Sequence, residues 1–224
     1  MVKKMNIKGL IFDFDGLILD TETPDVIAWK QIYAKYGHEF DFFNYAPAIG
    51  AVYEFNQPAD SLTQKIPNLK RDIVMEEWYR LKNKLIKPQA ISSGIPDYLL
   101  RAKELSLKIA IASSSTYEWV VGHLQRLGIK HFFNSIHTAD QTGIGKPDPA
   151  LYLLALKSLK IHCSEALAFE DSPNGITAAQ SAGIFCIAIP NPITKKLNIS
   201  HADLILNSLT DMTLDELINL VRTK

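Results

Sequence analysis

Short apolar runs, each followed at once by polar, turn-forming residues, most constrain what this chain can fold into. Four clear runs occupy residues 10–12, 108–112, 166–169 and 185–189, and two weaker ones occupy 135–138 and 203–206. Continuous apolar runs of this length are typical of strands in a parallel sheet that is covered on both faces. The sequence therefore predicts a buried, mostly parallel β-sheet.

Helical patterns lie between these runs, at 96–105, 117–127, 147–159 and 173–182. In the second of them, Val120, Leu124 and Leu127 recur on one face, and Gly128 follows as a stop signal. Strands that alternate with helices in this way predict an α/β fold with a doubly wound, Rossmann-like parallel sheet.

One long stretch, from about residue 23 to residue 87, interrupts the alternation and contains no convincing strand. Apolar residues recur there at helical spacing, with Trp29 and Ile32 in one face and Trp78 in another. We expect an inserted helical-bundle cap over residues 20–88, and an α/β catalytic core formed by residues 1–19 and 89–224. Linkers near 17–23 and 88–94 would allow the cap to open and close.

The charge balance excludes some partners. Among 224 residues, lysine and arginine together number 24, as do aspartate and glutamate. A formal net charge of zero argues against a nucleic-acid-binding protein.

No apolar run approaches the roughly 20 residues that span a bilayer, and Cys163 and Cys186 lack metal-type spacing. We therefore expect a cytoplasmic protein, a monomer or weak dimer, with no membrane or nucleic-acid partner.

Chemically active residues gather where the predicted strands end, which is where open parallel sheets bind ligands. The set comprises Asp13, Asp15, Ser113, Lys146, Glu170 and Asp171. Four carboxylates in one crevice repel one another and need a cation, and an oxygen-only ligand set indicates Mg²⁺. The lysine and the serine hydroxyl could hold phosphoryl oxygens, so the set suits phosphoryl transfer.

Each of these residues has an ordinary structural explanation when it is taken alone. An acid after a strand often caps a loop, and Ser113 with Ser114 could cap the helix that follows. Asp15 before Gly16 is a common turn signal. Only their joint arrangement indicates a catalytic site.

Four segments resemble the motifs of the haloacid dehalogenase superfamily of hydrolases. They are Asp-Phe-Asp-Gly at 13–16, the segment 109–113 ending in serine, Gly-Lys-Pro-Asp-Pro at 145–149, and Phe-Glu-Asp-Ser-Pro-Asn-Gly at 169–175. Their order and spacing match over essentially the whole chain. The helical insert is similar to that of the subgroup with β-phosphoglucomutase, phosphoglycolate phosphatase and related sugar-phosphate phosphatases.

The resemblance implies a phosphatase that acts on a small phosphorylated metabolite through an aspartyl-phosphate intermediate. Asp13 would be the nucleophile and a metal ligand. Asp15 would protonate the leaving oxygen, then deprotonate the attacking water, and its main-chain carbonyl would bind Mg²⁺.

The resemblance also implies the binding residues. Ser113, the Ser114 amide and Lys146 would hold the phosphoryl oxygens. Asp171 would ligate Mg²⁺, and Glu170 would be either a ligand or an acceptor behind the ligands.

Two alternatives stay open at this point. A phospho-accepting receiver-type module also combines acids, a serine or threonine and a Lys-Pro pair, but in a different order and in a chain about half as long. A β-phosphoglucomutase-like mutase would begin with the same phosphorylated aspartate. That branch carries a histidine at the position of Asp25, where a carboxylate could not donate as a histidine does. We therefore predict net hydrolysis.

Overall fold

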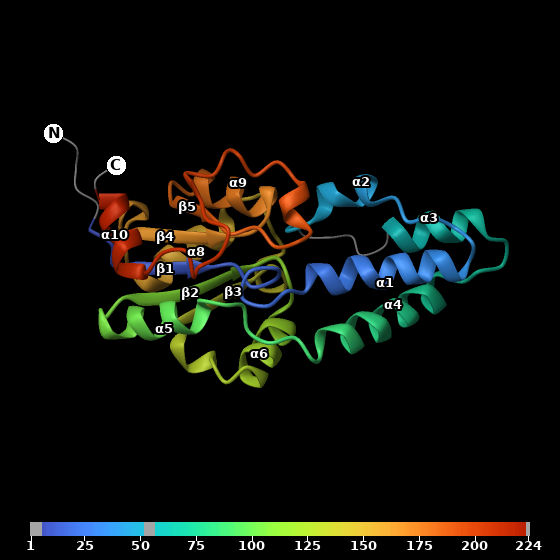
Figure 1. Ribbon diagram of the computed structural model, residues 1–224, viewed down its shortest axis with the longest axis horizontal. Coiled ribbons are helices and arrows are strands. Elements are labelled where there is room, and N and C mark those ends of the chain that lie inside the picture. The colour runs from blue at the N-terminus through green and yellow to red at the C-terminus, as the bar shows by residue number, and fades with distance from the viewer. Residues whose placement is uncertain (1–5, 52–56, 223–224) are drawn as a thin grey trace.

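The computed structural model describes residues 6–51 and 57–222. A six-stranded sheet forms its centre (Figure 1). The strands are β1 Gly9–Phe12, β2 Lys108–Ser113, β3 Ser135–Thr138, β4 Ala166–Glu170, β5 Phe185–Ala188 and β6 Leu204–Ile205. All pairings are parallel, in the order β3-β2-β1-β4-β5-β6. This confirms the predicted α/β class and its doubly wound sheet. The strands are added outward on one side of β1 from β2 to β3 and on its other side from β4 to β6.

Helices cover both faces of the sheet, as Figure 1 shows. On one face lie α5 Ile95–Glu104, α6 Tyr117–Arg126 and α10 Leu214–Arg222, and on the other lie α8 Ala150–Leu159 and α9 Pro173–Ser181. Between them come α7 Ala139–Thr142 and the 3-10 turns η2 Lys130–Phe132, η3 Cys163–Glu165 and η4 Thr194–Lys196.

The two faces of the sheet differ in side-chain size. Large side chains such as Phe12 and Phe169 point toward α5, α6 and α10. The opposite face presents Ala110, Ala112 and Ala168 to α8 and α9. Small residues there allow the two helices that flank the polar strand ends to pack closely on the sheet.

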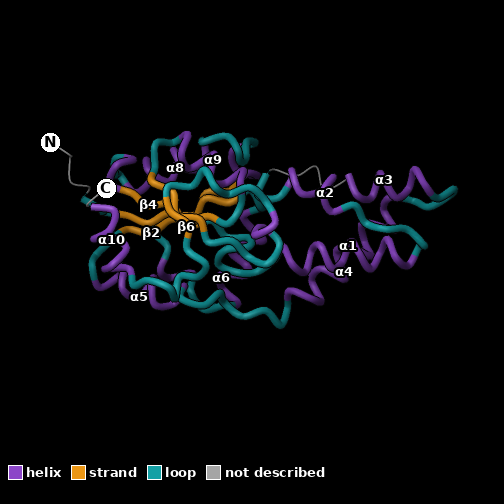
Figure 2. Tube along the Cα trace, turned by 45° about the horizontal axis from the view of Figure 1, so that its top comes forward, coloured by secondary structure: helices purple, strands orange, loops and turns teal. Residues whose placement is uncertain are grey.

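The inserted helices are α1 Glu22–Lys35, α2 Phe42–Tyr45, α3 Gln57–Lys65 and α4 Arg71–Ile86, with the 3-10 turn η1 Ala46–Ala48. They extend from the carboxyl edge of the sheet, as Figures 1 and 2 show. They share a hydrophobic cluster in which the Trp29 and Trp78 rings stack at 5.5 Å. We call these helices the cap. The boundaries 20–88 stay a prediction.

Not every apolar residue that recurs at helical spacing in α4 is buried. Ile73 fits the apolar spacing of α4, but it is 52% exposed, whereas Val74 is fully buried. The buried stripe of α4 follows Val74 and Trp78, because this face meets α1. No helix in the described part of the chain is both long and apolar enough to cross a membrane.

The cap docks on the core through backbone groups of its 47–50 segment. Asn174, in α9, donates to the carbonyl oxygens of Pro47 at 2.9 Å and Ile49 at 2.8 Å. Ser114 donates to the carbonyl oxygen of Gly50 at 2.9 Å. The backbone of Gly50 has φ +78°, and an added Cβ would lie 2.1 Å from the Ser172 hydroxyl. This docking therefore requires glycine at position 50.

Gly50→Ala is expected to lower kcat/KM by about tenfold, because the added methyl pushes the 47–50 segment off the core. Steady-state kinetics with a small phosphomonoester, the substrate class that the resemblance implies, would measure the loss. Gly37→Ala is the matched control: Gly37 also has positive φ, but nothing lies within 4 Å of its added Cβ. Equal losses in the two variants would contradict a role for the docking contact.

Candidate active site

The predicted acids converge at the carboxyl edge of the sheet. Asp13 follows β1, and Glu170 and Asp171 stand at the end of the adjacent β4. All three are buried, and each offers a carboxylate oxygen within 4.8 Å of the others. They meet because the two strands run parallel in register, with Phe12 opposite Phe169. This is the convergence that the strand pattern predicts.

Lys146 is the buried cation of this group. Its ammonium donates to Asp13 and, at 2.6 Å, to Glu170. Burial disfavours its charge, but the two carboxylates outweigh that effect and hold the pKa of Lys146 above the ordinary lysine value. Its main-chain N–H donates to the Ser114 hydroxyl at 3.2 Å, which ties the lysine loop to the end of β2. Lys146 therefore stays charged beside Asp13.

The acidic cluster has the properties expected of a cation site. Burial, and then the neighbouring Glu170 and Asp15, raise the pKa of Asp13 to about 8 against the pull of Lys146. Burial, and then the charges of Asp13 and Glu170, raise the pKa of Asp171 well above its ordinary range. One lysine thus does not compensate three buried carboxylates, and a hard divalent cation with oxygen ligands fits the remaining charge.

The Glu170 carboxylate is bonded to Lys146 and to further donors. Its Oε1 accepts from Lys146 and, at 2.6 Å, from the Tyr152 hydroxyl, while Oε2 accepts from the Asp171 N–H at 3.2 Å. An added Cβ on Gly175 would lie 1.9 Å from this carboxylate, so glycine is required there. Sequence reasoning missed Tyr152, because it stands in the apolar face of α8 and fits a core position.

Asp15 is held by four donors. Thr21 at 2.8 Å and the Trp119 indole at 2.9 Å donate to Oδ1. The Ser115 hydroxyl at 2.6 Å and the Ser113 hydroxyl at 3.4 Å donate to Oδ2. These donors come from the start of α1, the end of β2 and α6. Thr21 lies within the linker expected near 17–23, and no signal in the sequence indicated Ser115 or Trp119, since both belong to an ordinary helix start.

A further residue that the sequence did not indicate is Asn191. Its amide donates to Asp171 at 2.7 Å and to the carbonyl oxygen of Gly16 at 3.3 Å. It therefore fixes Asp171 against the loop that follows β1. No sequence pattern indicated this residue, because Asn191 lies in a turn after β5 between two prolines.

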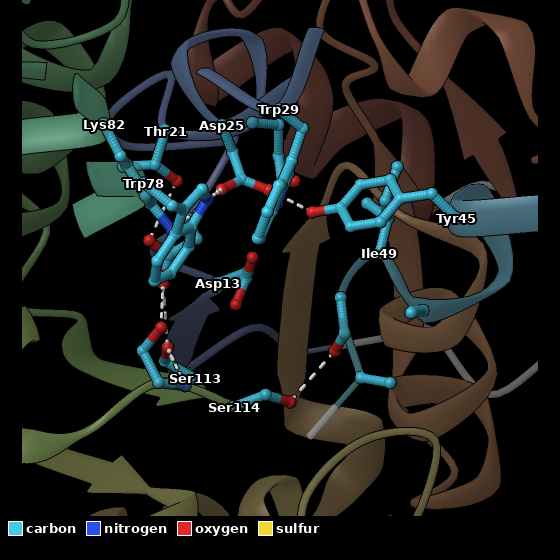
Figure 3. A pocket seen from close by; sticks show the side chains of 16 residues that line it. Asp13, Thr21, Asp25, Trp29, Tyr45, Ile49, Trp78, Lys82, Ser113 and Ser114 are labelled. Atoms are coloured by element: carbon cyan, nitrogen blue, oxygen red, sulfur yellow. Dashed lines mark hydrogen bonds and ion pairs between the residues drawn. The ribbon is translucent and has the colours of Figure 1, made fainter. Parts of the chain in front are cut away.

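A pocket separates these core residues from the cap, and Figure 3 shows Asp13 facing it. The core contributes Asp13, Asp15 and the serines at 113–115. The cap contributes polar side chains from α1, α2 and α4, among them Asp25. The volume is about 70 Å³, far below the roughly 300 Å³ of ordinary ligand pockets, so the side chains of cap and core leave little space between them.

An α/β core with acids, a lysine and serines at the carboxyl ends of its strands is typical of a hydrolytic enzyme. Comparison with known proteins identifies its family. The chain matches the family model described as haloacid dehalogenase-like hydrolase over residues 10–189. The chain belongs to this family.

Individual relatives narrow the class. The chain is 40% identical over 217 residues to "Putative phosphatase YhcW" of Bacillus subtilis, with 95% of this chain and 97% of that protein covered. It is 31% identical over 182 residues to "Phosphorylated carbohydrates phosphatase" of Thermotoga maritima, with 80% and 82% covered. Among solved structures, β-phosphoglucomutase from Clostridium difficile superposes with a TM-score of 0.75 at 25% identity, covering 97% of each chain.

These matches confirm the predicted family, fold and enzyme class, a phosphatase. They favour the enzyme over the receiver-type module. The roles of individual site residues stay predictions, as do the oligomeric state and the cellular location.

Proposed function

We propose that the chain hydrolyses a small phosphorylated sugar, or a similar phosphomonoester, through a phosphoryl group carried on Asp13, with Mg²⁺ as cofactor. One observation carries the proposal. Asp13 is a buried carboxylate that contacts Lys146 and faces a pocket, with Asp15 held on the same pocket by four donors. A nucleophile, a fixed cation and a second carboxylate are the groups that this reaction needs.

In the first half-reaction, an Asp13 oxygen forms a bond to phosphorus as the bond to the leaving oxygen breaks. Asp15 gives its proton to that leaving oxygen, so the alcohol departs neutral. Lys146 stays beside Asp13 and offsets the charge of the phosphoryl oxygens. Ser113 and the Ser114 amide stand at the end of β2, where they could donate to the same oxygens.

In the second half-reaction, water attacks phosphorus and the bond to Asp13 breaks. Asp15, now ionised, takes the proton from that water, and inorganic phosphate and the Asp13 carboxylate are restored. The same carboxyl group therefore serves as acid and then as base. Three of its four partners, Thr21, Ser113 and Ser115, contact it through hydroxyl groups, which can turn to accept as well as donate, so these contacts can rearrange as Asp15 loses and regains its proton.

Asp13, Asp171 and the main-chain carbonyl of Asp15 would hold Mg²⁺, and Glu170 completes the acidic set while it orients Lys146. When bound, Mg²⁺ supplies positive charge that neutralises the cluster and the phosphoryl oxygens. Asn191 keeps Asp171 turned toward this set.

The name of the Thermotoga maritima relative supports a phosphorylated carbohydrate as substrate. The Clostridium difficile structure keeps a phosphosugar mutase as the alternative. Asp25 bears on this choice. It is bonded to the Trp78 indole at 2.7 Å and paired with Lys82 at 3.6 Å, so it belongs to the cap structure and offers no proton-donating group in place of a histidine.

Incubation with β-glucose 1-phosphate, a trace of the 1,6-bisphosphate and Mg²⁺ tests the assignment. We expect inorganic phosphate as the product, and we expect exhaustive chelation to stop its release. Formation of glucose 6-phosphate faster than inorganic phosphate would favour the mutase. A parallel phosphate-release screen should include sugar phosphates, nucleotides, phosphoglycolate and p-nitrophenyl phosphate. Failure on every one of them would refute the phosphatase.

A further inference from the structure

We propose that the cap side of the pocket admits a neutral polyhydroxylated leaving group and excludes a second phosphate. This inference rests on the proposed function, because it concerns the part of the substrate that departs. The surface consists of five side chains of the pocket, which we call the cap wall: Glu22, Asp25, Tyr45, Trp78 and Lys82.

Asp25 positions the rest of the cap wall. One of its carboxylate oxygens accepts from the Trp78 indole at 2.7 Å and lies 3.6 Å from the Lys82 ammonium. The other accepts from the Tyr45 hydroxyl, as Figure 3 shows. Both oxygens are thus already bonded within the cap, and the carboxylate links α1 to α2 and α4. Asp25 therefore orients the surface and has little capacity left for a substrate.

Glu22 is the acid of the cap wall that is left for the substrate. It lines the pocket one turn before Asp25 on α1, and no hydrogen bond to its carboxyl group occurs within residues 6–51 and 57–222. Burial, and next the charge of Asp25, raise its pKa to about 8 against the effect of Lys82. Another anion is therefore unfavourable here, whereas an alcohol both donates and accepts and so can bond to the carboxyl group in either protonation state.

The positively charged side chains near the pocket are already paired with carboxylates. Among the described residues that line it, Lys82 is the only lysine or arginine, and it is paired with Asp25. Lys146 lies behind Asp13, bonded to Asp13 and Glu170. A second phosphate against the cap wall would thus meet Glu22 and Asp25 with one already paired lysine, whereas sites that hold phosphate usually offer arginine, lysine or several N–H donors.

The apolar part of the pocket agrees with a sugar-like group. Trp29 and Trp78 both line it, and their rings stack at 5.5 Å with an angle of 19° between them. A polyol has hydroxyl groups along its edge and C–H groups on its faces. The two rings stack on each other and are only 1% and 7% exposed, so they give the pocket a small apolar surface beside the polar groups of the cap wall.

The test compares each hexose or pentose monophosphate with the corresponding bisphosphate, at saturating Mg²⁺. Wild-type kcat/KM for the best monophosphate is expected to exceed that for its bisphosphate by about 100-fold. Glu22→Lys should narrow this ratio by at least about tenfold, because a cation replaces the acid, and Glu22→Gln should narrow it less. The control is Glu76→Lys, the same charge change at an exposed cap position outside the pocket, which should leave the ratio unaltered.

A wild-type enzyme that turns over a bisphosphate as well as its monophosphate would overturn the inference. So would an unchanged ratio in both Glu22 variants, provided that circular dichroism shows them folded. Glu22→Gln is nearly isosteric, and at an assay pH above the Glu22 pKa of about 8 it removes a negative charge, so the test at that pH stands even when the lysine variant does not fold. If wild type released no phosphate from any sugar phosphate or from p-nitrophenyl phosphate, the proposed function itself would fail, which is a different result.

Discussion

Asp13→Asn is expected to abolish turnover while the protein stays folded. An amide cannot carry the phosphoryl group, so the covalent route closes, and kcat should fall by about 10⁴-fold or more. The fold should tolerate the change, because asparagine keeps the shape of the aspartate side chain and Lys146 would still be paired with Glu170 at 2.6 Å. Thermal stability of the metal-free protein should not fall, since the buried Asp13 charge is itself unfavourable, as its pKa of about 8 indicates.

The measurement is phosphate release over hours with purified protein, alongside a thermal melt. Asp97→Asn makes the same chemical change at an exposed position of α5 and should leave kcat within a factor of about two. Retention of a tenth of the wild-type kcat by a clean Asp13→Asn preparation would rule out the covalent mechanism.

The second large effect is expected from Lys146→Met, in stability as well as in activity. Lys146 is 2% exposed and bonded to two buried carboxylates. Removing one partner of a buried ion pair leaves the other charge uncompensated, at a cost of about 3–5 kcal/mol. Urea unfolding in the presence of a chelator would measure this loss, and phosphate release with Mg²⁺ should fall at least about 100-fold.

Two further variants provide reference values for this loss of stability. Tyr152→Phe removes one hydrogen bond to Glu170 and should cost about 1–3 kcal/mol. Lys157→Met removes an exposed lysine of α8 and should change the free energy of unfolding by less than about 0.5 kcal/mol. A Lys146→Met loss no larger than that of Lys157→Met would mean that the buried pair is unimportant for folding.

The sequence predicts the core of this protein well because few physical rules govern it. Buried strands need continuous apolar runs, and parallel strands bring their carboxyl ends to one edge of the sheet. Asp13, Ser113 and Glu170 therefore had to meet once the strands were recognised. Lys146 was predictable only through the joint pattern, since its loop follows β3 and reaches the site across the end of β2.

The remaining site residues depend on contacts that no local pattern records. Tyr152 belongs to an apolar helix face, and only the packing of α8 on the sheet brings its hydroxyl to Glu170. Asp25 was predicted to stand where the mutase branch has a histidine, as a carboxylate that cannot donate. It does line the pocket, but partners from α2 and α4, distant in sequence, take up its oxygens. Side-chain partners on two other helices cannot be read from the sequence of the helix that carries Asp25.

The positions of the tryptophans have a practical consequence. The chain has three, and all stand at the site: Trp29 and Trp78 line the pocket, and Trp119 donates its indole N–H to Asp15. Indole emission shifts with solvent exposure and with nearby carboxylates, so fluorescence excited where indole absorbs and tyrosine does not comes only from the boundary between cap and core. Ligand entry, cap opening and changes in the contact between Trp119 and Asp15 can therefore be followed in the unmodified protein by stopped-flow spectroscopy, without a dye or a label.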